Sequence, residues 1–419
     1  MRIACAGGGP AGLYFAVLMK LWQPEIDVTV FERNVAGVTH GWGVIWEREF
    51  LDRLARLDAE SAAEIERSST RWRDQAISFR GARDVNRDNQ RTYAISRQRF
   101  VDILAARAGR LGVDIRYSRE IRDAAQLPDA DLIVAADGVN SLLRDGGRAG
   151  FGTRLSAGRN KYTWLGTSKA FASFSFFFEQ TEAGWIWAHA YPHEPTASTF
   201  IVECTPATWA ALGFDNGPAS RALDRLEQIF ARHLNGHHLT SRFPDDSEAR
   251  WQNFRTVRNE RWHDGRVALV GDAAHTAHFS VGLGTTLAMD DVIALAEHLR
   301  AVKTRGDLGS ALAAYQQQRQ SELREHALMA DRSEAWFENL PRYAALPPRE
   351  FATVLHARRA PLLPYLPPRV FCQLNRARER FPTVHALRRR LSRLPDPPCA
   401  SRRSDVGRAT AAFVDPSIR

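Results

Sequence analysis

Residues 2–12 read RIACAGGGPAG, an apolar run that leads directly into a cluster of glycines. The apolar run predicts a buried strand, and Gly7, Gly9 and Gly12 fit the pattern G-x-G-x-x-G. A helix is expected over 13–22 and a second strand over 26–31, and Glu32 closes that strand 20 positions after Gly12. Strand, glycine turn, helix, strand and acid in this order predict a site for a dinucleotide.

Each part of this pattern has a physical role. Gly7 allows the tight turn, Gly9 lets the backbone approach a pyrophosphate, and Gly12 lets helix and strand pack closely. The N–H groups at the start of the helix favour phosphates, and Glu32 is placed to accept hydrogen bonds from a ribose diol. The residues expected to contact the dinucleotide here are Gly7, Gly9, Pro10, Ala11, Gly12, Glu32 and Arg33. The pattern does not distinguish NAD from FAD.

Length and composition indicate a globular protein with more than one domain. The chain has 419 residues, of which 44% are hydrophobic and 25% are charged. No run approaches the roughly 18 apolar residues of a membrane span, and no signal leader precedes the first strand. We therefore expect a cytoplasmic protein without membrane contact. The four cysteines are scattered, which predicts reduced thiols and no metal site.

The basic charge is concentrated near the C-terminus. Residues 341–419 hold 16 arginines and 5 acids, whereas the whole chain has a net charge of +9. A solvated helical face explains such an excess, and a patch that meets a phosphate-rich ligand is the alternative. No nucleic-acid-binding motif accompanies the charge, so nucleic acid is not an expected partner.

The remaining elements indicate one domain interrupted by another. Buried strands are expected over 131–136 and 267–270, and aromatic stretches between about 159 and 250 predict antiparallel strands. Helices are expected over 97–111, 285–302 and 308–337, with short helices after them. The predicted division is a dinucleotide domain of residues 1–75, 93–155 and 255–335, a β-sheet substrate domain of residues 76–92 and 156–254, and a helical region of residues 336–419 rich in arginine and proline.

Two further loops identify the cofactor. Residues 136–144 read ADGVNSLLR, and residues 271–275 read GDAAH, followed by GLG at 282–284. Together with the opening pattern they resemble the single-component, p-hydroxybenzoate hydroxylase-like FAD monooxygenases. The resemblance implies an α/β fold with a Rossmann-like FAD domain of the glutathione-reductase type, an inserted antiparallel substrate sheet and C-terminal helices. It also implies FAD as cofactor and NADH or NADPH as a transient reductant.

The resemblance assigns roles to particular residues. Asp272 would bond the ribityl chain of FAD, Arg97 would contact FAD, and Asp137 would serve FAD and nicotinamide binding. The helix that begins after Gly282 would point its N-terminus at the flavin pyrimidine edge, where the partial positive charge of a helix stabilises negative charge. The residues in that turn are Gly282, Gly284 and Thr285. The alternatives are a helix-capping role for Asp272 and a turn role for Asp137.

Three blocks suggest a subgroup. Residues 158–167, 187–203 and 271–291 resemble hydroxylases of salicyloyl-CoA and 2-aminobenzoyl-CoA, and less closely the tryptophan hydroxylase of the violacein pathway. This implies hydroxylation of an electron-rich ring through a flavin hydroperoxide, at position 5 of salicyloyl-CoA or a close acyl-CoA analogue, to give gentisyl-CoA or its equivalent. The alternatives are a hydroxylase of a free aromatic or indole such as tryptophan and, more distantly, a flavin-dependent halogenase or a non-catalytic flavin-binding module. A monomer or a homodimer is expected.

The substrate site is expected on the strand over 185–191. With a period of two, Trp185, Trp187, His189 and Tyr191 share one face, which we predict faces flavin and substrate; core packing is the alternative. Trp46 and Phe279 are further candidates for substrate contact. His278 and His189 are the candidates for a catalytic base. His278 and Phe279 stand where the family usually has a different sequence, which implies a distinct active site.

A thioester substrate brings the phosphates of coenzyme A, which guanidinium groups bind well. The candidate holders are Arg358, Arg359, Arg376, Arg378 and Arg388 to Arg390.

Overall fold

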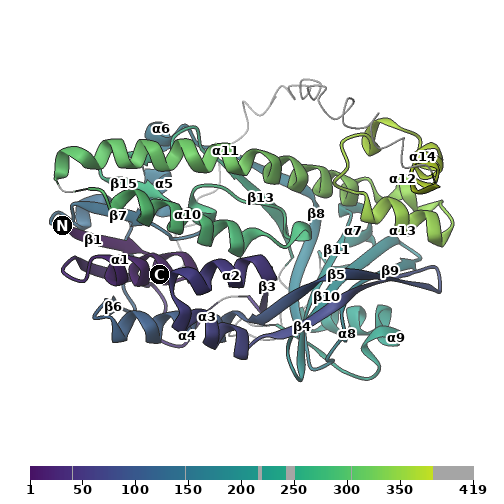
Figure 1. Ribbon diagram of the computed structural model, residues 1–419. Coiled ribbons are helices and arrows are strands. Elements are labelled where there is room, and N and C mark those ends of the chain that lie inside the picture. Colours follow the sequence, from purple (N-terminus) through teal and green to yellow (C-terminus); the bar gives the residue numbers. More distant parts are fainter. Residues whose placement is uncertain (40, 147, 216–218, 242–250, 303, 381–419) are drawn as a thin grey trace, which may run out of the picture. The chain divides into compact units, whose positions relative to one another are not determined.

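Two sheets organise the chain in the computed structural model, which describes residues 1–39, 41–146, 148–215, 219–241, 251–302 and 304–380 (Figure 1). The chain divides into a large compact unit, Met1–Arg369, and a second unit, Val370–Arg419. The described part of the second unit continues helix α14 (Pro368–Arg380). All that follows concerns the first unit.

The first sheet has six strands around the opening strand of the chain. Its order is β14 (His263–Asp264), β15 (Val267–Leu269), β7 (Leu132–Ala135), β1 (Arg2–Ala6), β2 (Asp27–Phe31) and β6 (Asp114–Arg116). All neighbours are parallel except β14 and β15. Strands over 26–31, 131–136 and 267–270 are thus confirmed to within one residue at each end, and β1 brings its carboxyl end beside those of β2 and β7.

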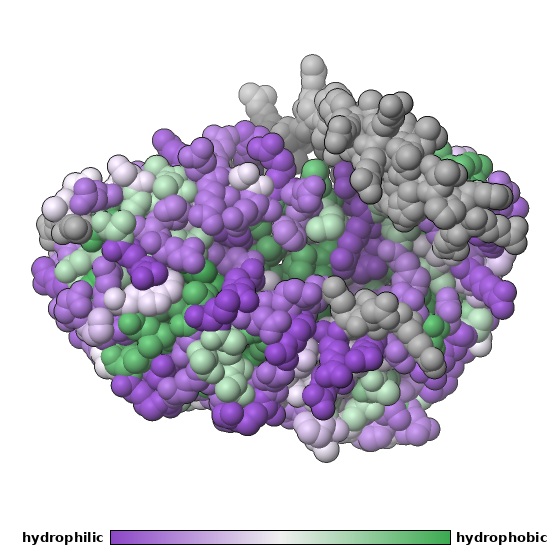
Figure 2. Space-filling model, viewed as in Figure 1, coloured by the Kyte–Doolittle hydropathy of each residue, from purple (hydrophilic) through white to green (hydrophobic). Residues whose placement is uncertain are grey.

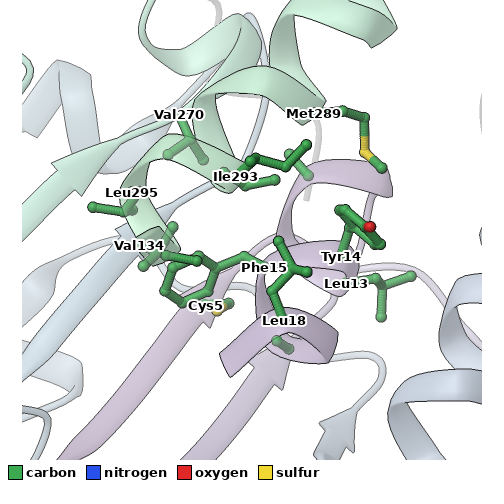
Figure 3. Packing of buried hydrophobic residues seen from close by; sticks show 14 of the residues in the cluster. Cys5, Leu13, Tyr14, Phe15, Leu18, Val134, Val270, Met289, Ile293 and Leu295 are labelled. Carbon is green, nitrogen blue, oxygen red and sulfur yellow. The ribbon is translucent and has the colours of Figure 1, made fainter. Parts of the chain in front are cut away.

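Helix α1 (Pro10–Trp22) is buried on all sides, because Pro10 through Met19 are all inaccessible to solvent. A helix that is apolar all round needs partners on every face. Helix α10 (Gly284–Leu299), helix α4 (Arg97–Arg110) and the sheet supply them. Figure 3 shows Phe15 and Leu18 packed with Val134 of β7 and with Ile293 and Leu295 of α10. The core therefore fixes the starts of α1 and α10 relative to the sheet.

The second sheet is larger and mostly antiparallel. Its order is β12 (Leu239–Thr240), β8 (Arg154–Thr167), β11 (Ala197–Cys204), β10 (Gly184–Glu194), β9 (Phe174–Thr181), β4 (Thr70–Phe79), β5 (Ala82–Ser96) and β3 (Gly43–Glu47), with β13 (Gln252–Arg258) paired to β8. Two features differ from the expectation. Strands β4 and β9 are parallel, and the sheet also takes β3 and residues 70–75 of β4, which the sequence assigned to the dinucleotide domain. The exact domain boundaries stay a prediction.

The two faces of this sheet are both covered. One face carries Phe177, Ala188 and Phe200, which pack with α8 (Ala219–Ile229) and the residues after it. The other carries Phe176, Trp187 and His189, against which Phe337 of helix α11 packs. Helix α11 (Arg305–Glu338) runs from the first sheet to the second (Figure 1). It begins three residues before the predicted start and ends one residue after the predicted end.

The remaining helices connect and cover these sheets. They are α2 (Arg48–Leu57), α3 (Ala59–Arg67), α5 (Leu142–Gly146), α6 (Arg148–Phe151), α7 (Pro206–Ala211), α9 (Ala231–Leu234), α12 (Leu340–Ala344), α13 (Pro348–His356) and the 3-10 turns η1 (Ala124–Gln126), η2 (Gly271–Ala273), η3 (Phe279–Val281) and η4 (Leu363–Tyr365). The described helices include none that is long and apolar enough to cross a membrane.

Candidate active site

The glycine turn between β1 and α1 leaves space for a ligand at one position only. Gly7 has φ of +111°, and a Cβ there would collide with the backbone of Ala136. A Cβ on Gly12 would overlap the carbonyl oxygen of Gly7, whereas at Gly9 nothing lies within 4 Å of the added atom. The first helical hydrogen bond runs from the N–H of Leu13 to the carbonyl of Gly9, 3.1 Å away. The N–H groups before it form an uncapped helix N-terminus, which suits a phosphate.

Glu32 is tied to the glycine turn. Its Oε2 accepts a hydrogen bond from the N–H of Gly8 at 2.7 Å, and its Oε1 accepts from the backbone and side chain of Asn34. A ribose would have to share these oxygens. The neighbouring Arg33 is exposed.

Asp272 and Arg97 lie close enough for each to shift the pKa of the other. Burial lowers the pKa of the Arg97 guanidinium, and the nearby Asp272 carboxylate opposes this shift. Burial raises the pKa of Asp272 above its ordinary value, and Arg97 in turn lowers it. Asp272 is nevertheless accessible to solvent. Asp272 therefore presents an exposed carboxylate, which a ligand hydroxyl could bind.

A buried ion network holds the loop that carries Asp272. Asp291 of α10 accepts hydrogen bonds from the N–H of Gly271 at 2.9 Å, from His275 Nε2 at 2.8 Å and from Arg319 Nε at 2.9 Å. His275 therefore helps to hold the loop. Asp291 itself was not singled out from the sequence.

Asp137 acts at least as a helix cap. Its Oδ2 accepts a 2.8 Å hydrogen bond from the N–H of Leu142 at the start of α5. Its Oδ1 is buried and has no hydrogen-bond partner among the described residues. Burial raises the pKa of this carboxyl. Asp137 therefore has a structural role as a cap, a role that the sequence analysis had considered for Asp272, and its second oxygen accepts no hydrogen bond from a described residue.

A second uncapped helix N-terminus belongs to α10. Gly282 has φ of +70°, and a Cβ there would approach Ile45 Cδ1 to 2.6 Å. Leu283 precedes the helix without a side-chain cap, and a Cβ on Gly284 would meet nothing within 4 Å. Gly271 lies between α10 and α1. An ideal Cβ on Gly271 would lie 3.0 Å from the Cβ of Ala288 in α10 and 3.8 Å from the Cβ of Ala11 at the start of α1. Two open helix ends and an accessible acid fit a flavin dinucleotide.

A narrow cavity lies beside the turn η3, and in this structure it leaves no room for a water molecule. Its lining combines aromatic rings with acids: Gly158, Asn160, Tyr162, Glu203, Phe254, His278, Phe279, Glu334 and Glu338. Figure 2 shows hydrophobic residues at the bottom of a hollow near the middle of the face in view. A separate, open depression of about 520 Å³ shares none of these lining residues.

Glu203 of β11 is the centre of a buried polar cluster beside the cavity. Its Oε1 accepts from Asn160 Nδ2 at 2.8 Å, and its Oε2 accepts from Trp187 Nε1 at 3.0 Å and lies 3.3 Å from His189 Nε2. Burial lowers the pKa of His189, so the ring is neutral near pH 7. His189 Nδ1 is buried without a hydrogen-bond partner among the described residues. Glu203 therefore orients His189 with an acceptor left over.

His278 lines the cavity and is neutral as well. Burial lowers its pKa to about 4, and the charges of Glu203 and Arg358 act on it in opposite directions. Its Nδ1 lies 2.7 Å from Ser280 Oγ and accepts from the N–H of Ser280 at 3.3 Å. The ring of Phe279 packs 4.2 Å from the His278 ring and edge-on against His189. These contacts bring His278, His189 and Phe279 together, as the sequence predicted.

Glu334 of α11 is the carboxylate in the cavity without a hydrogen bond to any described residue. Burial raises its pKa to about 7, and Glu338, Asp331 and Glu203 add to the shift. Glu338, in contrast, accepts from the backbone and side chain of Arg159. Sequence patterns gave no signal for Glu203 or Glu334, because both lie in ordinary amphipathic elements.

Known proteins resemble this chain over most of its length. A family described as FAD binding domain matches residues 1–327. Salicyloyl-CoA 5-hydroxylase of Streptomyces sp is 36% identical over 351 residues, which are 82% of this chain and 66% of that enzyme. 3-hydroxy-4-methyl-anthranilyl-[aryl-carrier protein] 5-monooxygenase of Streptosporangium sibiricum is 34% identical over 81% of this chain and 90% of its own length. Protodeoxyviolaceinate monooxygenase of Chromobacterium violaceum is 30% identical over 87% and 96%.

This chain belongs to the FAD-dependent aromatic monooxygenases. Solved structures show the same fold. The 2-methyl-3-hydroxypyridine-5-carboxylic acid oxygenase superposes with a TM-score of 0.62 at 22% identity, covering 86% of this chain and 98% of that one. PqsL from Pseudomonas aeruginosa gives 0.64 at 17% identity, covering 85% and 99%. The monooxygenase spans less than two thirds of the Streptomyces relative, which is longer.

Several residues predicted to contact substrate lie elsewhere in the monooxygenase. Trp185 stacks on Phe79 near the far end of β10, and Trp187 is fully buried against Phe337. Trp46 packs in the main core. Helix α11 covers this face at Trp187, which packs in the core, whereas Trp185 is half-buried; contact of these residues with substrate stays a prediction. Tyr191 is also buried, and its hydroxyl donates to the carbonyl of Gly43 at 2.8 Å.

The expected coenzyme A contact at Arg358 is wrong. Arg358 is 6% exposed, and its guanidinium donates to Ser333, Leu355 and Ser280 within the protein. Arg359 donates to the carbonyl of Val281 at 3.3 Å. Arg376 lies in the second unit, the side chain of Arg378 lies outside the description, and Arg388 to Arg390 lie outside the described residues.

Proposed function

We propose that the monooxygenase hydroxylates an aromatic ring that carries a hydroxyl or amino group beside a thioester carbonyl, with salicyloyl-CoA as the first candidate substrate. NADH or NADPH would be the reductant and molecular oxygen the co-substrate. The observation that carries the proposal is the narrow cavity beside η3, whose lining includes Glu334, a carboxyl without a hydrogen bond to a described residue, and the neutral histidine His278. The similarity to the Streptomyces hydroxylase supports the choice of substrate.

FAD, when bound and reduced, would supply an electrophilic oxygen atom from molecular oxygen, and such an atom reacts with an electron-rich ring carbon. The residues would hold FAD as follows: the open ends of α1 and α10 would meet its negative groups, and Asp272 would accept from its ribityl hydroxyls. Phe254, Phe279 and Tyr162 line the cavity and would keep water from the reacting ring.

Glu334 would act on the substituent that activates the ring. A carboxyl with a pKa of about 7 is close to the working pH, where a general base is most effective. In its ionised form Glu334 would accept the proton of a phenolic hydroxyl or hold an amino group. Removal of that proton raises the electron density of the ring carbon para to the substituent, the position that becomes hydroxylated.

An amino-substituted thioester is the second candidate. Three carboxylates line the cavity, and two of them, Glu203 and Glu338, are already hydrogen-bonded. An amino group supplies two donors, which suits such an acidic lining. The Streptosporangium relative, whose name specifies an anthranilyl group, supports this alternative.

Turnover assays separate these candidates. The FAD-loaded protein would be supplied with NADH or NADPH and with salicyloyl-CoA, 2-aminobenzoyl-CoA, free salicylate or tryptophan in turn. We expect the thioesters to stimulate reductant oxidation with formation of a hydroxylated thioester. Equal turnover of free salicylate, or turnover of tryptophan alone, would contradict the proposal.

A further inference from the structure

Arg358 is a buried cation without an anionic partner. Its Nε donates to Ser333 Oγ at 3.0 Å, its Nη1 to the carbonyl of Leu355 at 3.0 Å and its Nη2 to the carbonyl of Ser280 at 3.0 Å. The guanidinium also lies 5.4 Å from the ring of Phe176. No carboxylate among the described residues pairs with it. Because burying an unpaired charge is costly, such a residue needs a reason to be there.

A chain of hydroxyl groups connects Arg358 to His278. Ser333 Oγ lies 2.7 Å from Ser280 Oγ, which lies 2.7 Å from His278 Nδ1. All four side chains are buried. The chain joins α11, the loop after α13 and the turn η3, three elements that are far apart in the sequence.

The chemistry of its end groups gives this chain a direction. A guanidinium only donates hydrogen bonds, so Ser333 accepts from Arg358. Ser333 has no acceptor for its own proton other than Ser280 among the described residues, so it donates to Ser280. Ser280 then donates to His278 Nδ1, and the backbone N–H of Ser280 donates to the same atom at 3.3 Å. Nδ1 is therefore an acceptor, and the proton of the neutral ring sits on Nε2.

We propose that Arg358 is a positioning residue that acts through Ser333 and Ser280 to hold His278 in the Nε2–H tautomer, so that His278 donates a hydrogen bond into the cavity. His278 is thus a donor toward substrate in place of the base expected from the sequence. The acceptor would be an oxygen beside the reacting ring, such as the thioester carbonyl; only this last point rests on the proposed function.

With His278 as a donor and Glu334 as an acceptor, the cavity lining offers a substrate both kinds of hydrogen-bonding group. A ring with a carbonyl next to a hydroxyl or amino group matches both, whereas benzoyl thioesters lack the donor and simple phenols lack the carbonyl. Leaving either polar group unmatched costs binding, so the pair sets specificity.

Nitrogen NMR of the FAD-loaded protein with ¹⁵N-labelled histidine tests the tautomer directly, and the His278→Gln variant identifies the signals of His278. We expect a protonated Nε2 and an unprotonated Nδ1 in the wild type. Arg358→Met should give a mixture of tautomers, and Arg358→Lys, which restores a donor, should return the wild-type pattern. Arg359→Met is the matched control, because the hydrogen bond of Arg359 among the described residues goes to the carbonyl of Val281 and not to the hydroxyl chain.

Kinetics provide a second readout. Arg358→Met should raise the KM for the thioester about tenfold with a smaller effect on kcat, as expected for one lost hydrogen bond to substrate. If Arg358→Met does not fold, Ser333→Ala interrupts the same chain and should give the same mixture. A proton on Nδ1 in the wild type, or an unchanged tautomer in the folded variants, would overturn the inference. Failure of every thioester as a substrate would instead overturn the proposed function and leave the NMR result intact.

Discussion

Gly12 lies so close to the carbonyl of Gly7 that a methyl group on Gly12 would overlap that oxygen, whereas a methyl group on Gly9 would meet nothing. Gly9 also has an ordinary φ of −76°. We therefore expect Gly9→Ala to fold with a stability within about 1 kcal/mol of wild type but to lose FAD affinity at least about tenfold, because the methyl group occupies ligand space. Gly12→Ala should lose roughly 1–3 kcal/mol of stability or more. Thermal unfolding without added FAD and fluorescence titration with FAD separate the two effects; unchanged FAD affinity of a folded Gly9→Ala protein would be inconsistent with this site.

Asp272 is an exposed acid close to the Arg97 guanidinium, and we expect it to contact FAD. Asp272→Asn should weaken FAD binding by roughly 10- to 100-fold, the range expected for a lost hydrogen bond to a charged group. Asp129→Asn is the control. The Asp129 side chain is 80% exposed, and this variant should bind FAD like wild type. Titration of the FAD-free proteins measures both, and equal affinities would exclude a contact between Asp272 and the cofactor.

Asp291 ties the loop of Asp272 to α10. Burial raises the pKa of Asp291, but His275 and Arg319 outweigh burial and leave the pKa below its ordinary value of 3.8. Replacing this carboxylate leaves buried donors unpaired, so Asp291→Asn should cost about 3–5 kcal/mol of unfolding free energy at pH 7. Because the folded-state pKa is depressed, this stabilisation is present above pH 4 and is lost as the pH falls through the folded-state pKa. Denaturant melts at pH 7 and below pH 4 measure it; a gap between wild type and variant that stays constant over this range would contradict the assignment.

Glu334 should shape the pH dependence of the reaction. Burial raises its pKa to about 7, and only the ionised form accepts a proton from the substrate. We expect kcat/KM for the thioester to rise as the pH increases through about 7 and to level off above it. The rise should disappear in Glu334→Gln. Persistence of the inflection in that variant would assign it to another group.

The nucleotide half of the molecule was predictable because its constraints are local. The glycine turn, the buried helix α1 and the loop at Asp272 each depend on a few neighbouring residues, and the structure places them where the sequence suggested. The substrate half depends on long-range contacts. Trp187 was predicted to form part of a pocket wall, but only the packing of α11 against β10 shows that it is covered.

The polar centre of the site shows the same limit. Glu203, Glu334 and Arg358 come from β11, α11 and the segment after α13, and none stands in a recognisable motif. Arg358 belongs by sequence to a basic region that suggested phosphate binding. Its burial and its three internal acceptors show an inward role, which no pattern of charge along the chain reveals.

The most direct measurement is product analysis of the FAD-loaded protein with salicyloyl-CoA, NADH or NADPH, and ¹⁸O-labelled oxygen. The account predicts a hydroxylated thioester that carries one labelled oxygen atom, formed in step with reductant oxidation. Reductant oxidation that yields only hydrogen peroxide with every thioester offered, and no labelled ring product, would contradict it.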